Sequence, residues 1–330
     1  MVYENRYSFA NKDGIYKDDA FEVNPSWKET LIIFGKNKGA IFGVIFVLFM
    51  GVLAIWGPKF NSYTYDQVMM DAQNMPPRIP GIEKLGVFNG TIKGVDMYQM
   101  KGMEDTYFWF GTDALGRDLF TRFCQGTRIS FIVAIVSAVL CLIIGVSYGL
   151  IAGYFGGLVD NFMMRVIEII NGVPSLVIVS LLVVVLQPGL KSIIIAMVIS
   201  GWTDMARLVR ANTLRLKASE YVMASKTLGT MIVKILFGNI LPNLLSSVIV
   251  MAMMTIPGAI FMEAFLSFIG LGIPAPQASL GSLINDGYNH MMMYPYQMII
   301  PSVFFAILMV SLNLVGDGLR DALDPKQRRA

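Results

Sequence analysis

The stretch AIFGVIFVLFMGVLAIW, residues 40–56, contains no charged side chain. A helix needs about 20 mostly apolar residues to cross the ~30 Å hydrocarbon core of a bilayer, and runs of about 17 still suffice. Lys36 and Lys38 precede the stretch and Gly57-Pro58 follows it, which favours a helix that ends at Trp56. Residues 40–57 are therefore predicted to form a first transmembrane helix.

The composition of the whole chain agrees with this interpretation. Of 330 residues, 55% are hydrophobic and 15% are charged, and the mean hydropathy is +0.59, far above that of a soluble domain. Turn-forming segments such as Gly153–Gly157 and Pro188-Gly189 separate further apolar runs at about 129–152, 162–186, 192–208, 244–266 and 298–315. The chain is predicted to be an all-α membrane protein with six transmembrane helices and both termini on one side.

Lysine and arginine residues indicate the orientation, because cytoplasmic loops hold an excess of them. They gather in the loop after the fourth run and at the C-terminal end, at Arg207, Arg210, Arg215, Lys217, Lys226, Lys234, Arg320, Lys326, Arg328 and Arg329, and are absent from 265–298. We expect a cytoplasmic N-terminal segment 1–39, an extracytoplasmic segment 58–127, a transmembrane core 128–320 with a cytoplasmic loop 209–241, and a cytoplasmic tail 321–330. The first apolar run follows about forty polar and charged residues, so it is expected to stay as an anchor.

Several kinds of chemistry lack the residues that they need. His290 is the only histidine, so a histidine-based metal site is not expected. Cys124 and Cys141 are too few for a disulfide framework and are expected to be free thiols. The only Gly-Lys dipeptide, Gly35-Lys36, has no glycine-rich phosphate loop before it. The chain is expected to have no catalytic residue, metal or cofactor of its own and to draw energy from a partner.

Residues 219–242, SEYVMASKTLGTMIVKILFGNILP, form the most informative part of the charged loop. Gly229 suits the left-handed residue that ends a helix, and Thr230 can cap the next helix. That next helix is too short to span a bilayer and carries one apolar stripe, made of Met231, Ile232, Ile235 and Leu236. Such a stripe needs something to bury it.

This loop resembles the signature loop of ATP-binding cassette (ABC) importer permeases, which reads Glu-Ala-Ala, three residues, Gly, nine residues, Ile-x-Leu-Pro. Ala224, Gly229, Leu241 and Pro242 match the pattern, whereas Met223, Ser225 and Asn239 depart from it at the first Glu, the second Ala and the Ile. The resemblance implies the type I ABC importer permease fold, with a cytoplasmic coupling helix that docks into a groove of an ATPase subunit. It assigns coupling to Ala224, Gly229, Met231, Ile235, Leu241 and Pro242.

Two further regions are similar to the C-type subunit of dipeptide, oligopeptide and nickel permeases. One is FGTDALGRDLFTR at 110–122 with GTRIS at 126–130, and the other is EAFLSFIGLG at 263–272 with SLG at 279–281, where Leu280 stands in place of the usual Trp. The resemblance, which spans roughly 27–325, implies oligopeptides or dipeptides as cargo. It also implies a B-type permease, two ATPase subunits that hold ATP and Mg, and an extracytoplasmic peptide-binding protein as partners. Nickel is the alternative cargo and is disfavoured by the single histidine.

Four charged residues are candidates for the pathway or its mouth: Glu263, Asp113, Arg117 and Asp118. An unpaired carboxylate in hydrocarbon is costly, so Glu263 is expected to face the pore or its mouth, or to pair with another subunit. The other three are alternatively a solvated charge cluster. Arg165 and Glu168 are interpreted as a local ion pair, and Pro174 and Pro257 as kinks in apolar helices.

Methionines such as Met251, Met253, Met254 and Met291–Met293 are interpreted as adaptable apolar surface, with a methionine-lined ligand site as the alternative. The expected location is the bacterial inner (plasma) membrane, in contact with lipid and without a nucleic-acid partner. A function of a different class, an ion-coupled secondary transporter or channel, would need paired charges in mid-membrane and inverted repeats. Mid-span charges are sparse, and no convincing repeat is present.

Overall fold

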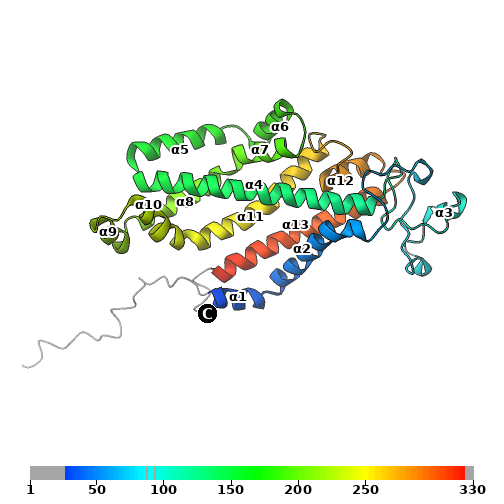
Figure 1. Ribbon diagram of the computed structural model, residues 1–330, viewed down its shortest axis with the longest axis horizontal. Coiled ribbons are helices and arrows are strands. Elements are labelled where there is room, and N and C mark those ends of the chain that lie inside the picture. The colour runs from blue at the N-terminus through cyan, green and yellow to red at the C-terminus, as the bar shows by residue number, and fades with distance from the viewer. Residues whose placement is uncertain (1–26, 87, 93, 324–330) are drawn as a thin grey trace, which may run out of the picture.

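The computed structural model describes residues 27–86, 88–92 and 94–323. They form an elongated helical bundle with an irregular segment at one end (Figure 1). The helices are α1 (Trp27–Lys36), α2 (Lys38–Trp56), α3 (Met97–Met100), α4 (Leu119–Phe155), α5 (Gly157–Asn171), α6 (Ser175–Leu186), α7 (Leu190–Gly201), α8 (Thr203–Leu216), α9 (Glu220–Thr227), α10 (Ile232–Lys234), α11 (Leu241–Phe268), α12 (Leu280–Asn289) and α13 (Tyr296–Leu323). Strands β1 (Thr91–Ile92) and β2 (Val95–Asp96) form an antiparallel pair. Most of the predicted N-terminal segment and of the tail, 1–26 and 324–330, lies outside the described residues.

The six-span helical architecture is confirmed. Within the described residues, five helical stretches are long and apolar enough to cross a bilayer, namely α2, α4, α7 with α8, α10 with α11, and α13; the bent pair α5 and α6 makes a sixth if it counts as one span. The kink expected at Pro174 is a 77° bend between α5 and α6, because proline has no N–H to continue a helix. Pro257, in contrast, lies inside α11, which continues through it. The side of the membrane on which each end lies stays a prediction.

Helix α4 begins at Leu119, well before the expected start of the second span. Asp118 caps it, because its Oδ2 atom accepts a hydrogen bond from the Thr121 backbone N–H at 2.7 Å. The helix is 37 residues long, and at about 1.5 Å per residue it exceeds the bilayer core. Its first turns therefore extend into the segment that the sequence assigns to the extracytoplasmic side.

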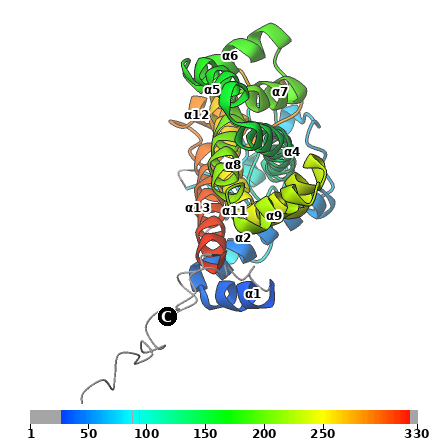
Figure 2. The ribbon, with the colours of Figure 1, turned by 90° about the vertical axis from the view of Figure 1, so that its left-hand side faces the viewer.

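Glycines let α4 and α8 pack closely. Gly145, Gly149 and Gly153 follow one another at every fourth position of α4, and a Cβ atom on any of them would lie within 2.7 Å of an atom of α8. At Gly149 the nearest atom is the backbone oxygen of Ala206, at 2.5 Å. Small residues at this spacing are typical of contacts between membrane helices. Figures 1 and 2 both place α5, α6 and α7 on one side of this pair and α1 and α2 on the other.

The irregular segment between α2 and α4 lies at the end of the bundle that also holds α12, opposite α9 and α10 (Figure 1). It has a small core of its own, made of Ala72, Met75, Tyr98 and Phe108. The Gln297 amide of α13 donates to the Thr112 carbonyl oxygen and to Asn74 Oδ1, both at 2.9 Å, and so fastens the segment to the bundle. The segment is therefore a folded cap on one end of the helices.

Candidate functional site

The loop that resembles the coupling loop lies at the free end of the bundle, after α8 (Figure 1). Helix α9 is followed by Gly229, whose φ of +74° is the predicted left-handed conformation. The predicted cap at Thr230 is wrong, because Met231 is the N-cap of α10 and no side chain caps it. Helix α10 then continues through a π-helical segment, Ile235–Ile240, into α11. The expected second short helix is thus the first part of the fifth span.

The apolar stripe of this loop divides between the inside and the outside of the chain. Met231 is 76% exposed, and Leu228, which sequence reasoning did not single out, is 85% exposed. Ile235 is only 1% exposed and packs in one core with Val222. The assignment of Ile235 to an ATPase-docking surface is corrected accordingly, since the return of α9 over the start of α10 buries it inside the chain. Of the other assigned residues, Ala224, Gly229 and Pro242 are exposed and Leu241 is half-buried.

Two departures from the family pattern contact each other. The Asn239 amide donates to Ser225 Oγ at 2.7 Å, which ties α9 to the π-helical segment. Next to it, the Asn243 amide donates to the Tyr221 hydroxyl at 3.2 Å. A pair of polar residues at two positions where the pattern has Ala and Ile is the signal that sequence reasoning missed.

Asp113 and Asp118 are buried, and Arg117 between them is mostly buried. Asp113 forms an ion pair with Arg117 at 2.7 Å, and its Oδ1 atom accepts hydrogen bonds from the backbone N–H groups of Leu115 and Arg117 at 2.9 Å. Asp118 Oδ2 accepts from Thr121 and from the Asn61 amide. Burial raises the pKa of Asp118 to about 6, although these hydrogen bonds oppose the shift. The solvated interpretation is wrong, and a pathway role for these residues stays a prediction.

Glu263 does not face an opening in this chain, contrary to expectation. It is fully buried, with Oε2 accepting a hydrogen bond from Ser130 at 2.7 Å and Oε1 from Ser267 at 2.8 Å. Ser279, the N-cap of α12, donates to Ser267 Oγ at 3.0 Å. These residues come from the segments 126–130, 263–272 and 279–281, so the blocks that carry the resemblance converge on one buried carboxylate.

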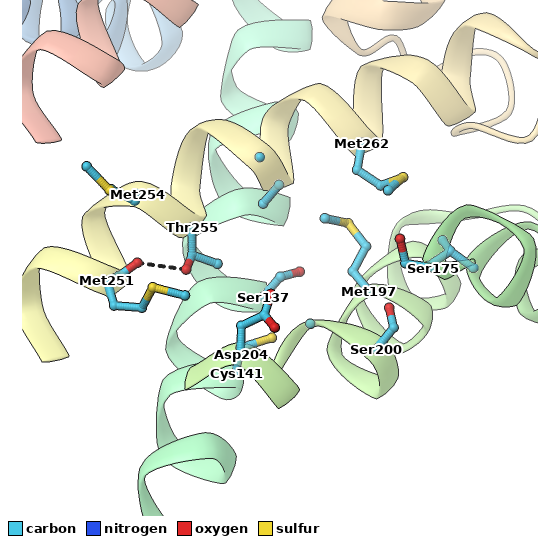
Figure 3. A pocket seen from close by; sticks show the side chains of 14 residues that line it. Ser137, Cys141, Ser175, Met197, Ser200, Asp204, Met251, Met254, Thr255 and Met262 are labelled. Atoms are coloured by element: carbon cyan, nitrogen blue, oxygen red, sulfur yellow. Dashed lines mark hydrogen bonds between the residues drawn. The ribbon is translucent and has the colours of Figure 1, made fainter. Parts of the chain in front are cut away.

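A cavity of about 370 Å³ lies between α4, α6, α7, α8 and α11 (Figure 3). Met251 and Met254 line it, whereas Met253 does not. Its other lining side chains include Met197, Met262, Ser137, Ser175, Ser200, Thr255, Cys141 and Asp204. Sequence reasoning did not single out Asp204 or Ser137, because no local pattern shows that they face one space.

The remaining expectations concern an ion pair, the two cysteines and metal binding. Arg165 and Glu168 form the predicted ion pair, with 2.7 Å between Nη1 and Oε2, on an exposed face of α5. Cys124 and Cys141 are both free and buried. Among the described residues, no group of three or more His, Cys, Asp or Glu side chains is placed to hold a metal ion.

These features define a multi-pass helical membrane permease. The chain belongs to the family described as binding-protein-dependent transport system inner membrane component, whose family model matches residues 145–329. Residues 26–77 match the N-terminal TM domain of oligopeptide transport permease C. The chain is therefore a permease subunit of an ABC importer in the bacterial membrane.

Similar proteins agree with this membership. The oligopeptide transport system permease protein OppC of Bacillus subtilis is 44% identical over 92% of this chain and 90% of its own length. The dipeptide transport system permease protein DppC of the same organism is 42% identical, over 89% and 84%. Among solved structures, a chain of the MetNI methionine ABC transporter in an inward-facing conformation matches with a TM-score of 0.50 at 19% identity. That match covers 62% of this chain and 96% of the other, and it shows a shared fold.

Proposed function

We propose that this chain is the C-type permease of an ATP-driven importer of oligopeptides or dipeptides. The observation that supports peptide as cargo is the similarity to oligopeptide and dipeptide permeases along most of the chain. Nickel stays the alternative cargo from the sequence, but nothing in these relatives' names supports it. No feature favours an ion-coupled secondary transporter over the family to which the chain belongs.

The assembly that we propose contains a B-type permease, two ATPase subunits that bind ATP and Mg, and an external peptide-binding protein. Leu228 and Met231 project from the free end of the bundle beside the left-handed Gly229, and exposed apolar groups of this kind are favourable contacts for a groove on a partner. In the proposed orientation this end and both termini are cytoplasmic, and the folded cap between α2 and α4 meets the binding protein outside. ATP-driven closure of the ATPases would move the coupling segment and open the pathway outward.

Purification of the chain with its genomic neighbours tests this assembly. We expect ATPases and a second permease to co-elute, and the complex in proteoliposomes to take up labelled peptide only with ATP and the loaded binding protein. If the chain alone moved peptide, the assembly would be wrong. If the complex moved nickel and no peptide, the cargo would be wrong.

A further inference from the structure

The cavity between α4, α6, α7, α8 and α11 has the composition of a site for one end of a peptide. Four methionines supply flexible, polarizable walls (Figure 3), which adapt to side chains of different shape. Its volume of about 370 Å³ falls within the range of small-molecule sites, about 300–1,000 Å³. A wall of this kind accepts varied side chains without selecting one.

Asp204 is the only charged residue that lines the cavity. It lies in the apolar stretch Leu190–Leu216, three residues before Arg207, and its side chain is exposed where it lines the cavity. Within the described part of the chain, its carboxylate has no ion-pair or hydrogen-bond partner. A cation is therefore the complementary ligand group.

Stabilisation of a helix start is the other role open to Asp204, because it lies in the first turn of α8. Helix α8 nevertheless follows α7 with only Trp202 between them, and the Ala206 N–H already donates to the Trp202 carbonyl oxygen at 3.0 Å. The start of α8 therefore carries little positive charge for the Asp204 carboxylate to balance.

Ser137 supplies an independent observation. Its side chain is 2% exposed and lines the cavity, yet its hydroxyl has no hydrogen-bond partner. Leaving a buried hydroxyl unpaired costs free energy, and a ligand in the cavity would remove that cost. Thr255 differs, because its hydroxyl donates to the Met251 carbonyl oxygen at 2.8 Å, the dashed line in Figure 3.

The charges also define which end of a peptide fits. No lysine, arginine or histidine lines the cavity, so a peptide carboxylate would have no counter-ion there. From the proposed peptide-import function, on which this inference rests, we infer that the cavity binds the amino-terminal residue of the peptide. Its α-ammonium group meets Asp204, its backbone meets Ser137, and its side chain lies against the methionines.

The test is photo-cross-linking to the whole complex without the binding protein, which removes the selectivity of that protein. The probe is a dipeptide with p-benzoylphenylalanine as its second residue, compared with its N-acetylated form. We expect the free amine to cross-link to this chain and the acetylated form to do so at least about tenfold less, since the acetylated nitrogen carries no charge to pair with Asp204. Asp204→Asn should lower cross-linking, and peptide uptake measured with the binding protein present, by a similar factor, and Asp204→Glu should restore part of both.

A second variant tests whether the cavity must stay open. A Cβ atom on Gly258 meets nothing within 4 Å, so Gly258→Leu fills the cavity without a backbone clash and should also reduce cross-linking and uptake about tenfold. The controls are Met253→Leu, outside the cavity, and Asp317→Asn, an exposed carboxylate elsewhere. These should stay within about twofold of the wild type, as surface changes do.

The possible outcomes distinguish failure of this site from failure of the proposed import function. If the wild type takes up peptide and both Asp204→Asn and Gly258→Leu take it up equally well, the proposed site is wrong and the import function stands. Loss of the partner subunits from the Asp204→Asn complex would also overturn the site, because Asp204 would then be an assembly contact. A wild-type complex that takes up no peptide at all would overturn the proposed function and this site with it.

Discussion

Ser130 and Glu263 lie 133 positions apart in the sequence, and the Ser130 hydroxyl donates to Glu263 Oε2 at 2.7 Å in the interior of the bundle. Because Glu263 also accepts from Ser267, and Ser267 accepts from Ser279, one buried carboxylate joins α4, α11 and the start of α12. A buried polar group with its hydrogen bonds made is tolerated, and one that loses a partner is expensive. The position of α12 thus depends on residues far away in the sequence.

Ser130→Ala should destabilise the protein, because it removes one hydrogen bond from Glu263 without adding a replacement. We expect a loss of about 1–3 kcal/mol in the free energy of unfolding and a Tm lower by several degrees in the purified complex. The control is Ser180→Ala, since the exposed Ser180 hydroxyl bonds only the Val177 carbonyl oxygen of its own helix. Equal Tm values for the two variants would contradict a stabilising effect of the hydrogen bond between Ser130 and Glu263.

Gly149→Leu should disrupt the contact between α4 and α8. A Cβ atom at this position would lie 2.5 Å from the Ala206 backbone oxygen, and the larger side chain would force the helices apart. We expect little folded protein in detergent by size-exclusion chromatography, as overpacking of a tight helix contact costs about 1–3 kcal/mol or more. Gly51→Leu is the matched control on α2, where a Cβ atom meets nothing within 4 Å; a monodisperse Gly149→Leu protein would argue against the close packing.

The sequence predicted the features that depend on neighbouring residues. Hydropathy located the spans, Pro174 marked the bend between α5 and α6, and the spacing around Gly229 indicated a left-handed turn. Features that depend on distant residues were missed. Hydrophobic periodicity placed Ile235 and Met231 on one stripe, but only the folded position of α9 shows that Ile235 is covered and Met231 is not.

The candidate site shows the same division. A carboxylate near the end of an apolar run is costly wherever it lies. The sequence around Glu263 therefore does not show whether this side chain faces a pore or a cluster of serines. The three serines that surround it belong to segments whose meeting is a property of the whole fold. The cavity beside Asp204 was missed for this reason, because five helices contribute to it.

Thiol labelling of intact cells tests the proposed orientation. Met100 is 67% exposed on the cap between α2 and α4, and Lys36 is exposed at the end of α1. Met100→Cys should react with an impermeant maleimide, and Lys36→Cys should react only after the membrane is permeabilised. The native thiols of Cys124 and Cys141 are buried and should give little background. The reverse pattern would invert the topology.

Gly229→Asp should abolish ATP-driven uptake while the spans stay folded. A Cβ atom at Gly229 meets nothing within 4 Å, so the variant costs only about 1–2 kcal/mol for a side chain in the left-handed conformation. It would nonetheless place a carboxylate beside the exposed Leu228 and Met231, where a partner groove would have to desolvate it. Uptake, Tm and co-elution of the ATPases are the measurements.

Two comparisons make the Gly229 result specific. Gly35→Asp changes an exposed glycine with equally open surroundings and should leave uptake unchanged. Ile235→Asp should instead unfold the protein, because it puts a charge into the core that contains Val222. Normal uptake by Gly229→Asp would remove the loop from the coupling mechanism.

Asp118 should make stability depend on pH in the acidic range. Burial raises its pKa from 3.8 to about 6 in the folded protein, so between these values the folded state binds more protons than the unfolded state. The free energy of unfolding therefore falls as the pH rises through this window, by on the order of 3 kcal/mol for this group, and is level above it.

Asp118→Asn does not titrate and keeps an oxygen that can accept from Thr121. Any constant effect of the amide is the same at every pH, so the Tm of the wild type minus that of the variant should decrease from about pH 4 to pH 7. A difference in Tm that stays constant over this range would mean that Asp118 is ionised in the folded protein throughout it.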